Sequence, residues 1–130
     1  MGVPAAKQND QIVGTDIHIV MIPSPGGPVP TPLPHPFVGL IDSGVSSDVN
    51  ADGMAIAVQG STATNNPPHI PQGGPFQSPP ANKGEIMMGS TTVFANGSPV
   101  ARNGDTALNC NDPADAPTGT VIAVGTVFVG

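Results

Sequence analysis

The side chains best suited to chemistry in this sequence of 130 residues are three histidines and one cysteine: His18, His35, His69 and Cys110. Three imidazole nitrogens and one thiolate form a complete ligand set for tetrahedral zinc, and a site closed by four protein ligands is typical of a structural ion. The intervals between these residues, 17, 34 and 41 positions, contain no short chelating pair. The residue types therefore indicate a metal site, while the spacing alone favours ordinary surface histidines and a buried cysteine.

The composition also indicates that the chain needs an additional source of stability. It contains 17 glycines and 17 prolines but few large apolar side chains, so little apolar burial offsets the entropy lost on ordering it. Small domains with so little apolar burial are usually stabilised by a disulfide, a metal or a partner. A single cysteine cannot form an internal disulfide, so the sequence favours a metal and a partner.

Composition excludes several classes of protein and favours one fold class. The only cationic residues are Lys7, Lys83 and Arg102, too few to neutralise phosphates, so we expect no nucleic-acid binding. No apolar run approaches the ~20 residues of a membrane span. No basic start precedes an apolar stretch, so we expect no signal peptide and synthesis in the cytoplasm. Valine and isoleucine dominate the apolar residues, which favours strands and an all-β fold.

The sequence repeats itself at a distance of 44 residues. Residues 48–63 align without a gap with residues 92–107, and Asp52-Gly53 falls where Asn96-Gly97 falls. Both dipeptides are strong signals of a two-residue hairpin turn. The repeat therefore predicts two similar β-hairpins.

A further copy, counted below as the first copy because its second arm opens the chain, is split between the chain ends. The last residues, Thr126-Val127-Phe128, resemble the first arm of a hairpin, and residues 2–10 resemble the second arm. We predict one domain, residues 1–130, that closes as a ring of three hairpins with pseudo-threefold symmetry and adjacent termini. The hairpins span about 126–130 with 2–10, 47–63 and 91–107.

Short glycine-bounded strands are predicted before each hairpin, at residues 39–44, 84–89 and 119–125. Two proline-rich stretches, residues 23–36 and 67–80, favour extended polyproline conformation and are not expected in a sheet interior. We interpret them as rigid, extended cover over a small β-core. The alternative is that they are docking ligands for partner modules.

The repeat strengthens the metal hypothesis, because each copy places one candidate ligand shortly after its second arm. The aligned positions are Asp10, Ser61 and Asp105. His18 lies 8 residues after the first of them, His69 lies 8 residues after the second, and Cys110 lies 5 residues after the third. His35 comes from the first proline-rich stretch and supplies the fourth ligand. We therefore predict one metal ion bound by these four residues toward one end of the ring.

The sequence gives little support for other chemistry. The acidic residues Asp10 and Asp105 are predicted to cap turns.

These motifs resemble those of the PAAR-repeat family. Pro4-Ala5-Ala6-Lys7 and Pro99-Val100-Ala101-Arg102 resemble its Pro-Ala-Ala-Arg signature, whereas the middle copy reads Met54-Ala55-Ile56-Ala57. The resemblance implies a small cone of β-hairpins with long Pro/Gly-rich loops and a metal at the apex. It also implies one zinc per chain, with iron less favoured, bound by three histidines and a cysteine.

The same resemblance implies a function. Members of the family cap the homotrimeric VgrG-type spike of type VI secretion systems and related contractile injection machines. We therefore expect a structural protein and not an enzyme, present as one copy per spike trimer and delivered outside the cell. It would pierce a target membrane rather than bind it, and would help to load effector cargo.

Two alternatives remain open at this point. A small metal hydrolase would use the three histidines and a water molecule, with Cys110 outside the metal shell. A proline-rich interaction module would have little fixed structure.

Overall fold

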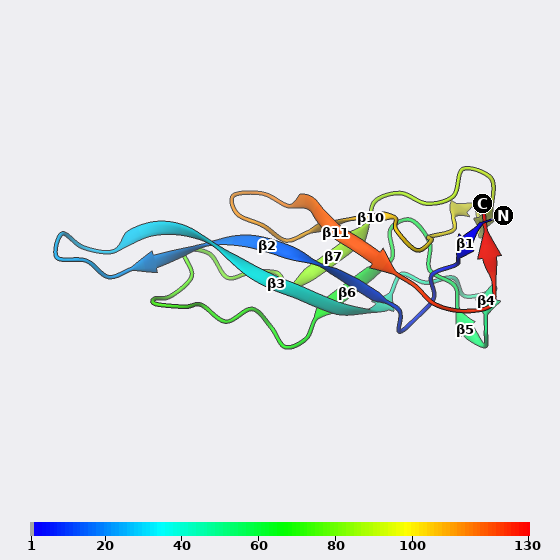
Figure 1. The fold of residues 1–130 in the computed structure, drawn as a ribbon, viewed down its shortest axis with the longest axis horizontal. Helices are drawn as coiled ribbons and strands as arrows, with labels where there is room; N and C mark the ends of the chain where they lie inside the picture. Colours follow the sequence, from blue (N-terminus) through cyan, green and yellow to red (C-terminus); the bar gives the residue numbers. More distant parts are fainter. Residues whose placement is uncertain (1) are drawn as a thin grey trace.

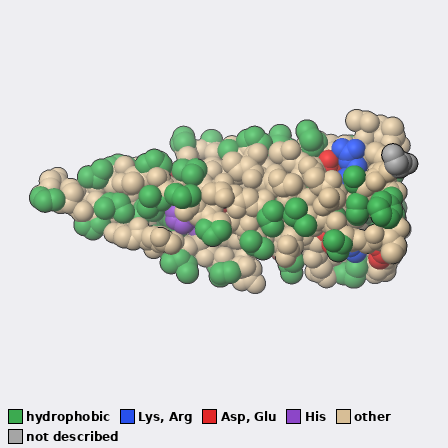
Figure 2. Space-filling view, viewed as in Figure 1, with side chains coloured by type: hydrophobic (Ala, Val, Ile, Leu, Met, Phe, Trp, Pro, Cys, Tyr) green, Lys and Arg blue, Asp and Glu red, His purple; other side chains and the backbone are tan. Residues whose placement is uncertain are grey.

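The computed structural model of the chain describes residues 2–130 and shows an elongated molecule that tapers from a wide end to a narrow end (Figure 1, Figure 2). These residues contain strands and no helix, and accordingly no helix that is long and apolar enough to cross a membrane. The predicted all-β class is confirmed. The strands are β1 (Val3–Pro4), β2 (Gln11–Ile22), β3 (Val29–Ser43), β4 (Asn50–Ala51), β5 (Met54–Ala55), β6 (Thr62–Asn65), β7 (Lys83–Ile86), β8 (Phe94–Ala95), β9 (Ser98–Pro99), β10 (Thr106–Asn109), β11 (Ala116–Ile122) and β12 (Phe128–Val129).

Six of these strands form one closed antiparallel sheet in the order β10-β11-β2-β3-β6-β7. Inward and outward side chains alternate along the strands, as in β3, where residues 35, 37, 39 and 41 are buried and the residues between them are exposed. The bias of the sequence toward β-branched residues thus supplies both strand propensity and core. The largest apolar side chains of the main core cluster are Ile12, Phe37, Ile41, Ile86 and Val121.

The longest hairpin is made by β2 and β3, and it forms the narrow end of the molecule. Its register runs without a break from Gln11 opposite Leu40 to Ile22 opposite Val29. The rest of the closed sheet contacts only the first part of this hairpin, since β3 pairs with β6 only from Gly39 onward. The remaining length projects outward, so the turn at residues 23–28 is the tip (Figure 1).

The interpretation of residues 23–36 as cover outside the sheet is wrong for residues 29–36, which join the sheet at an edge and not in its interior. Strand β3 begins at Val29 and includes the four prolines at even-numbered positions from 30 to 36, all of which are exposed. In an antiparallel pair every second residue directs its N–H away from the neighbouring strand. Proline lacks this N–H, so it fits these alternate positions where β3 pairs only with β2.

The second proline-rich stretch, residues 67–80, contains no named strand and lies along β2. The Met21 N–H donates to the Pro75 carbonyl oxygen at 2.8 Å. The Gln77 N–H donates to the Ile19 carbonyl oxygen, also at 2.8 Å. Residues 75–77 therefore cover part of β2, as the sequence predicts, whereas bends at residues 72–74 and 77–78 show that the segment is not extended throughout.

Three two-stranded hairpins lie at the wide end: β4 with β5, β8 with β9, and β1 with β12 (Figure 1). The first two contain the predicted turns, with φ of 50° and 82° at Asp52-Gly53 and 52° and 81° at Asn96-Gly97. Positive φ at both positions is the signature of a type I′ turn. The third hairpin joins the two chain ends, with Val3 opposite Val129. The predicted antiparallel pairing of the termini is confirmed.

One backbone hydrogen bond recurs three times in a closed circuit next to these hairpins. The Ala6 N–H donates to the Ala101 oxygen at 2.9 Å, the Ala101 N–H to the Ala57 oxygen at 3.0 Å, and the Ala57 N–H to the Ala6 oxygen at 2.9 Å. The three alanines occupy equivalent positions in the sequence repeat, and each is 0% exposed. They belong to one core cluster, so a small side chain at this position lets the three segments meet.

The turn after each second arm also recurs. In the first and third copies a backbone N–H donates to a carboxylate three residues on, from Lys7 to Asp10 at 3.0 Å and from Arg102 to Asp105 at 2.7 Å. In the middle copy the Ser61 hydroxyl accepts the N–H of residue 58 at 3.0 Å. The predicted turn-capping roles of the two aspartates are therefore confirmed, and serine performs the same role without charge.

Candidate metal centre

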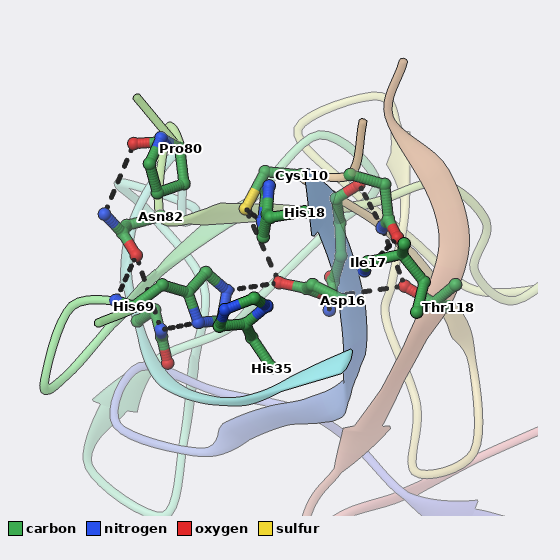
Figure 3. Close-up of polar contacts among 12 residues, drawn as sticks. Asp16, Ile17, His18, His35, His69, Pro80, Asn82, Cys110 and Thr118 are labelled. Atoms are coloured by element: carbon green, nitrogen blue, oxygen red, sulfur yellow. Dashed lines mark hydrogen bonds and ion pairs between the residues drawn. The ribbon is translucent and has the colours of Figure 1, made fainter. Parts of the chain in front are cut away.

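The four predicted ligands come from different segments that converge inside the molecule (Figure 3). His18 lies in β2 and His35 in the neighbouring strand β3, so both are held by the sheet and not by covering loops. His69 follows β6, and Cys110 directly follows β10. Two adjacent strands and the segments after two others thus position the group.

The three imidazole rings face one another in a triangle. Their centroids are separated by 4.9 Å for His18 and His69, 5.5 Å for His35 and His69, and 5.6 Å for His18 and His35. Cys110 Sγ lies 3.6 Å from His18 Nε2. All four residues are buried, with exposed fractions between 1% and 8%. The structure therefore brings together the residues that the sequence singled out.

Asp16 also belongs to this group, and sequence reasoning missed it. One donor atom each from Asp16, His18, His69 and Cys110 lies within 4.8 Å of the other three, a set that does not include His35. The Asp16 carboxylate is completely buried. Asp16 and His18 are two residues apart on one strand and therefore share its inward face. Recognising β2 as a strand through this point would have paired them.

His35 is oriented as a metal-binding histidine would be. Its Nδ1 lies 2.9 Å from the Leu33 carbonyl oxygen, so Nδ1 carries the proton and Nε2 holds the free lone pair. Metal-binding histidines usually donate their second ring nitrogen to a carbonyl or carboxylate in this way. Nε2 itself is buried without a hydrogen-bond partner. A buried unpaired nitrogen is costly, and a cation bound there would satisfy it.

His18 presents its Nε2 to Cys110, while its Nδ1 faces Asp112. Nδ1 lies 3.5 Å from Asp112 Oδ2 and makes no hydrogen bond. The same carboxylate oxygen accepts the Ile19 N–H at 2.9 Å, which holds it next to the ring. His18 therefore directs Nε2 into the cluster and has a carboxylate behind it.

His69 has a partner for each ring nitrogen. Its Nδ1 accepts a hydrogen bond from the Asn65 amide at 3.1 Å, and its Nε2 donates to Asp16 Oδ2 at 2.8 Å. The Asn65 orientation is set by the Val38 N–H, which donates to Asn65 Oδ1 at 2.9 Å. Metal binding through Nε2 therefore requires the ring proton to move to Nδ1 and the Asn65 amide to turn over.

Burial sets the protonation of the group. Desolvation raises the pKa of the Cys110 thiol to about 11. Desolvation also lowers the pKa of His18, against the opposing effect of Asp112. The site without a cation therefore holds a neutral thiol and a neutral His18 imidazole at pH 7. Because cysteine binds metals as the thiolate, cation binding must displace the thiol proton.

The donors fit an ion that binds thiolate and imidazole. Zinc is the commonest such ion in closed structural sites, and iron accepts the same ligand types. A cavity of about 250 Å³ opens beside His35 and His69 and is lined by Pro36, Val38 and residues 65–68. Because His35 and His69 are among its lining residues, the cavity lies directly beside the candidate metal centre.

The chain matches the PAAR motif family over residues 21–113, more than half of its length. It therefore belongs to this family, which is associated with the spike tips of type VI secretion systems. Membership implies a structural spike-tip protein. No curated protein matches the chain.

Proposed function

We propose that this chain is the tip protein of a contractile injection machine of the type VI secretion kind. One copy caps a homotrimeric VgrG-type spike through its wide end, and one internal zinc ion stabilises its narrow half. The observation that carries the proposal is the threefold recurrence of turns and backbone hydrogen bonds at the wide end. We infer from it a pseudo-threefold arrangement, which would let a single chain offer one similar edge to each of three identical subunits.

Exposed apolar side chains at the wide end support such an interface. Phe94 and Phe128 occupy equivalent positions in two copies of the repeat, and they are 57% and 59% exposed. Figure 2 shows hydrophobic side chains at the wide end, close to the lysine, arginine and acidic side chains. Aromatic anchors surrounded by polar groups are typical of protein interfaces.

The proposed zinc ion is bound by His18, His35, His69 and Cys110, one ion per chain. The orphaned Nε2 of His35 and the convergence of four segments support this ligand set. A bound ion would link β2, β3 and the segments that follow β6 and β10. Structural zinc can contribute on the order of 10 kcal/mol of apparent folding free energy in small domains, comparable to their whole stability.

On this proposal the chain is made in the cytoplasm, loaded on the spike and carried out of the cell with it. The narrow end pierces the target membrane, and the tip helps to load effector cargo. The motivation is the family membership together with the tapered shape. A tagged chain should reach the medium from cells with an intact machine and stay inside cells that lack the contractile sheath. Equal export from both would contradict this part of the proposal.

A small metal hydrolase is the second candidate function, and the cavity beside His35 and His69 favours it. That mechanism needs an open ligand position for water and leaves Cys110 outside the metal shell. Cys110 Sγ lies only 3.6 Å from His18 Nε2, which favours the closed site. Replacing Cys110 by Ser separates the two functions: metal and folding are lost with the closed site, whereas metal is largely retained with the hydrolase.

The test of the tip function is a pull-down with the trimeric spike protein of the same locus, with stoichiometry read by native mass spectrometry. One chain per three spike chains supports the proposal, and three per three or no binding contradicts it. The double variant Phe94→Asp/Phe128→Asp should abolish binding. Ile70→Asp is the matched control, since Ile70 is 69% exposed but lines the cavity by the histidines.

A further inference from the structure

We propose that Asp16 binds the metal ion directly, as an oxygen ligand beside His18, His35, His69 and Cys110. This inference rests on the proposed metal centre and extends it from four donors to five. It also assigns to the centre a second negative charge, besides that of the thiolate.

The placement of Asp16 is the first argument. It lies opposite His35 in the register of β2 and β3, and its carboxylate is 0% exposed. Oδ2 lies 2.8 Å from His69 Nε2 and 3.5 Å from Cys110 Sγ. Two ligands of one zinc ion lie roughly 3–4 Å apart, because each lies about 2.0–2.3 Å from the metal. Asp16 Oδ2 is therefore at the distance of a fellow ligand from Cys110 Sγ, and it is slightly closer, at hydrogen-bond distance, to His69 Nε2.

The directions of the hydrogen bonds are the second argument. The Nε2–H of His69 and the S–H of Cys110 both donate to the same oxygen, Asp16 Oδ2 (Figure 3). These are the two protons that must leave these atoms when they bind a metal. A cation that takes the place of both protons will contact the oxygen that had accepted them.

The charge balance is the third argument. Among residues 2–130, the only ion-pair partner of Asp16 is His69. Oδ1 accepts hydrogen bonds from the Asn109 amide at 3.2 Å and the Thr118 hydroxyl at 3.4 Å, which leaves Oδ2 for the cluster. A divalent ion with one thiolate and three neutral imidazoles keeps one positive charge. The Asp16 carboxylate makes the centre neutral, and a neutral centre is cheaper to bury.

Asp112 provides the natural comparison, since it is the other carboxylate next to a candidate ligand. It faces Nδ1 of His18, on the side of the ring away from Cys110. It can therefore orient the ring but does not lie among the donor atoms. Asp16 and Asp112 should thus affect metal binding in different ways, one as a ligand and the other as a positioning residue.

The decisive measurement is X-ray absorption at the zinc edge of the zinc-loaded wild-type chain. Five donors with one sulfur support the inference, and four donors with one sulfur overturn it. A chain that binds no ion overturns the proposed metal centre itself, so the two failures are distinguishable. This measurement requires no substitution and is independent of whether a variant folds.

Two alanine variants supply the matched test. Loss of a residue that only orients a ligand typically weakens metal affinity by roughly 10–100-fold, which is the effect expected for Asp112→Ala. We expect Asp16→Ala to weaken metal affinity by more than about 100-fold in a chelator competition, since a ligand and a charge are both lost. In the cobalt-substituted protein, Asp16→Ala should also strengthen the visible d–d bands as five-coordinate cobalt becomes tetrahedral, whereas Asp112→Ala should leave them unchanged. Identical spectra for wild type and Asp16→Ala contradict the inference.

Discussion

The wide and narrow ends of this molecule are stabilised in different ways. At the wide end, three copies of one hairpin meet through small apolar side chains and a repeated set of backbone hydrogen bonds. In the narrow half, the projecting hairpin of β2 and β3 breaks the repeat, and buried polar side chains occupy the interior where the segments meet. Residues 17–41 contain no Asp, Glu, Lys or Arg, so ion pairs of their own cannot stabilise this hairpin.

This difference shows what repetition can and cannot provide. Three similar arms can share a core when an alanine fits at their meeting point, as at Ala6, Ala57 and Ala101. A tapering end has too few side chains in cross-section to form an apolar core. A polar group that binds a cation can hold such segments together instead, provided that the cation is present.

Metal removal should produce the largest effect and should act mainly on the narrow half. The expected loss is on the order of 10 kcal/mol of apparent stability, enough to unfold β2 and β3. Hydrogen exchange with and without a chelator should show protection lost first in these strands and last at the Ala6, Ala57 and Ala101 amides. An unchanged melting temperature after complete chelation contradicts the account.

Acid should mimic chelation, since the ligands must be deprotonated to bind a metal. The ordinary pKa of a histidine is 6.5, and burial lowers the pKa of His18 below this value in the folded chain. As the pH falls, the unfolded chain therefore takes up this proton before the folded chain does. The stability contributed by this histidine is therefore present above pH 6.5 and is lost as the pH falls below it. Metal content and melting temperature should fall together in a titration from pH 7 to about pH 5. A chain that keeps both its metal and its melting temperature at the lowest pH of the titration would contradict this prediction.

Overpacking the point where Ala6, Ala57 and Ala101 meet should disturb the apolar core that these alanines share with the closed sheet, and not the metal centre. Ala57→Leu adds volume where three alanines meet at 0% exposure, and we expect it to cost about 1–3 kcal/mol. Urea unfolding measures the loss, with Ala81→Leu at an exposed position as the control. Zinc content should remain at the wild-type level in both. Metal loss in Ala57→Leu would show that the two ends are not independent.

The smallest loss of stability is expected from a substitution at a position where the copies of the repeat differ in charge. Arg102 lies 2.8 Å from Asp105, whereas the middle copy has Val58 at the equivalent position. Because the arginine side chain is partly exposed, Arg102→Val should cost only about 0.2–1 kcal/mol. Thermal unfolding at low and high salt measures it. A loss comparable to that of Ala57→Leu would mean that the ion pair, and not the repeated backbone, holds the third copy.

Local chemistry made the wide end predictable from sequence. Asn96-Gly97 and Asp52-Gly53 tolerate positive φ, so their turns could be located without a structure. The split third hairpin followed from the resemblance of Thr126-Val127-Phe128 to a first arm. The aligned positions also related His18 and His69, although the way in which their rings meet could not be read from spacing.

The narrow half was less predictable, because its strands depend on tertiary context. Alternate prolines normally argue against a strand, and β3 accepts them only because its exposed edge requires no N–H at those positions. The same misreading hid Asp16, which shares a face with His18 only once β2 is known to extend to Ile22. Leu33, His35 and Phe37 recur at every second position between the prolines, and this alternation was the signal in the sequence that could have predicted strand β3.

The central claim, that one metal ion holds the narrow half together, is tested most directly by elemental analysis of the chain purified without added metal. The account predicts one equivalent of zinc per chain in the wild type and its loss in Cys110→Ser. Folded wild-type protein with less than about half an equivalent of any transition metal would contradict it.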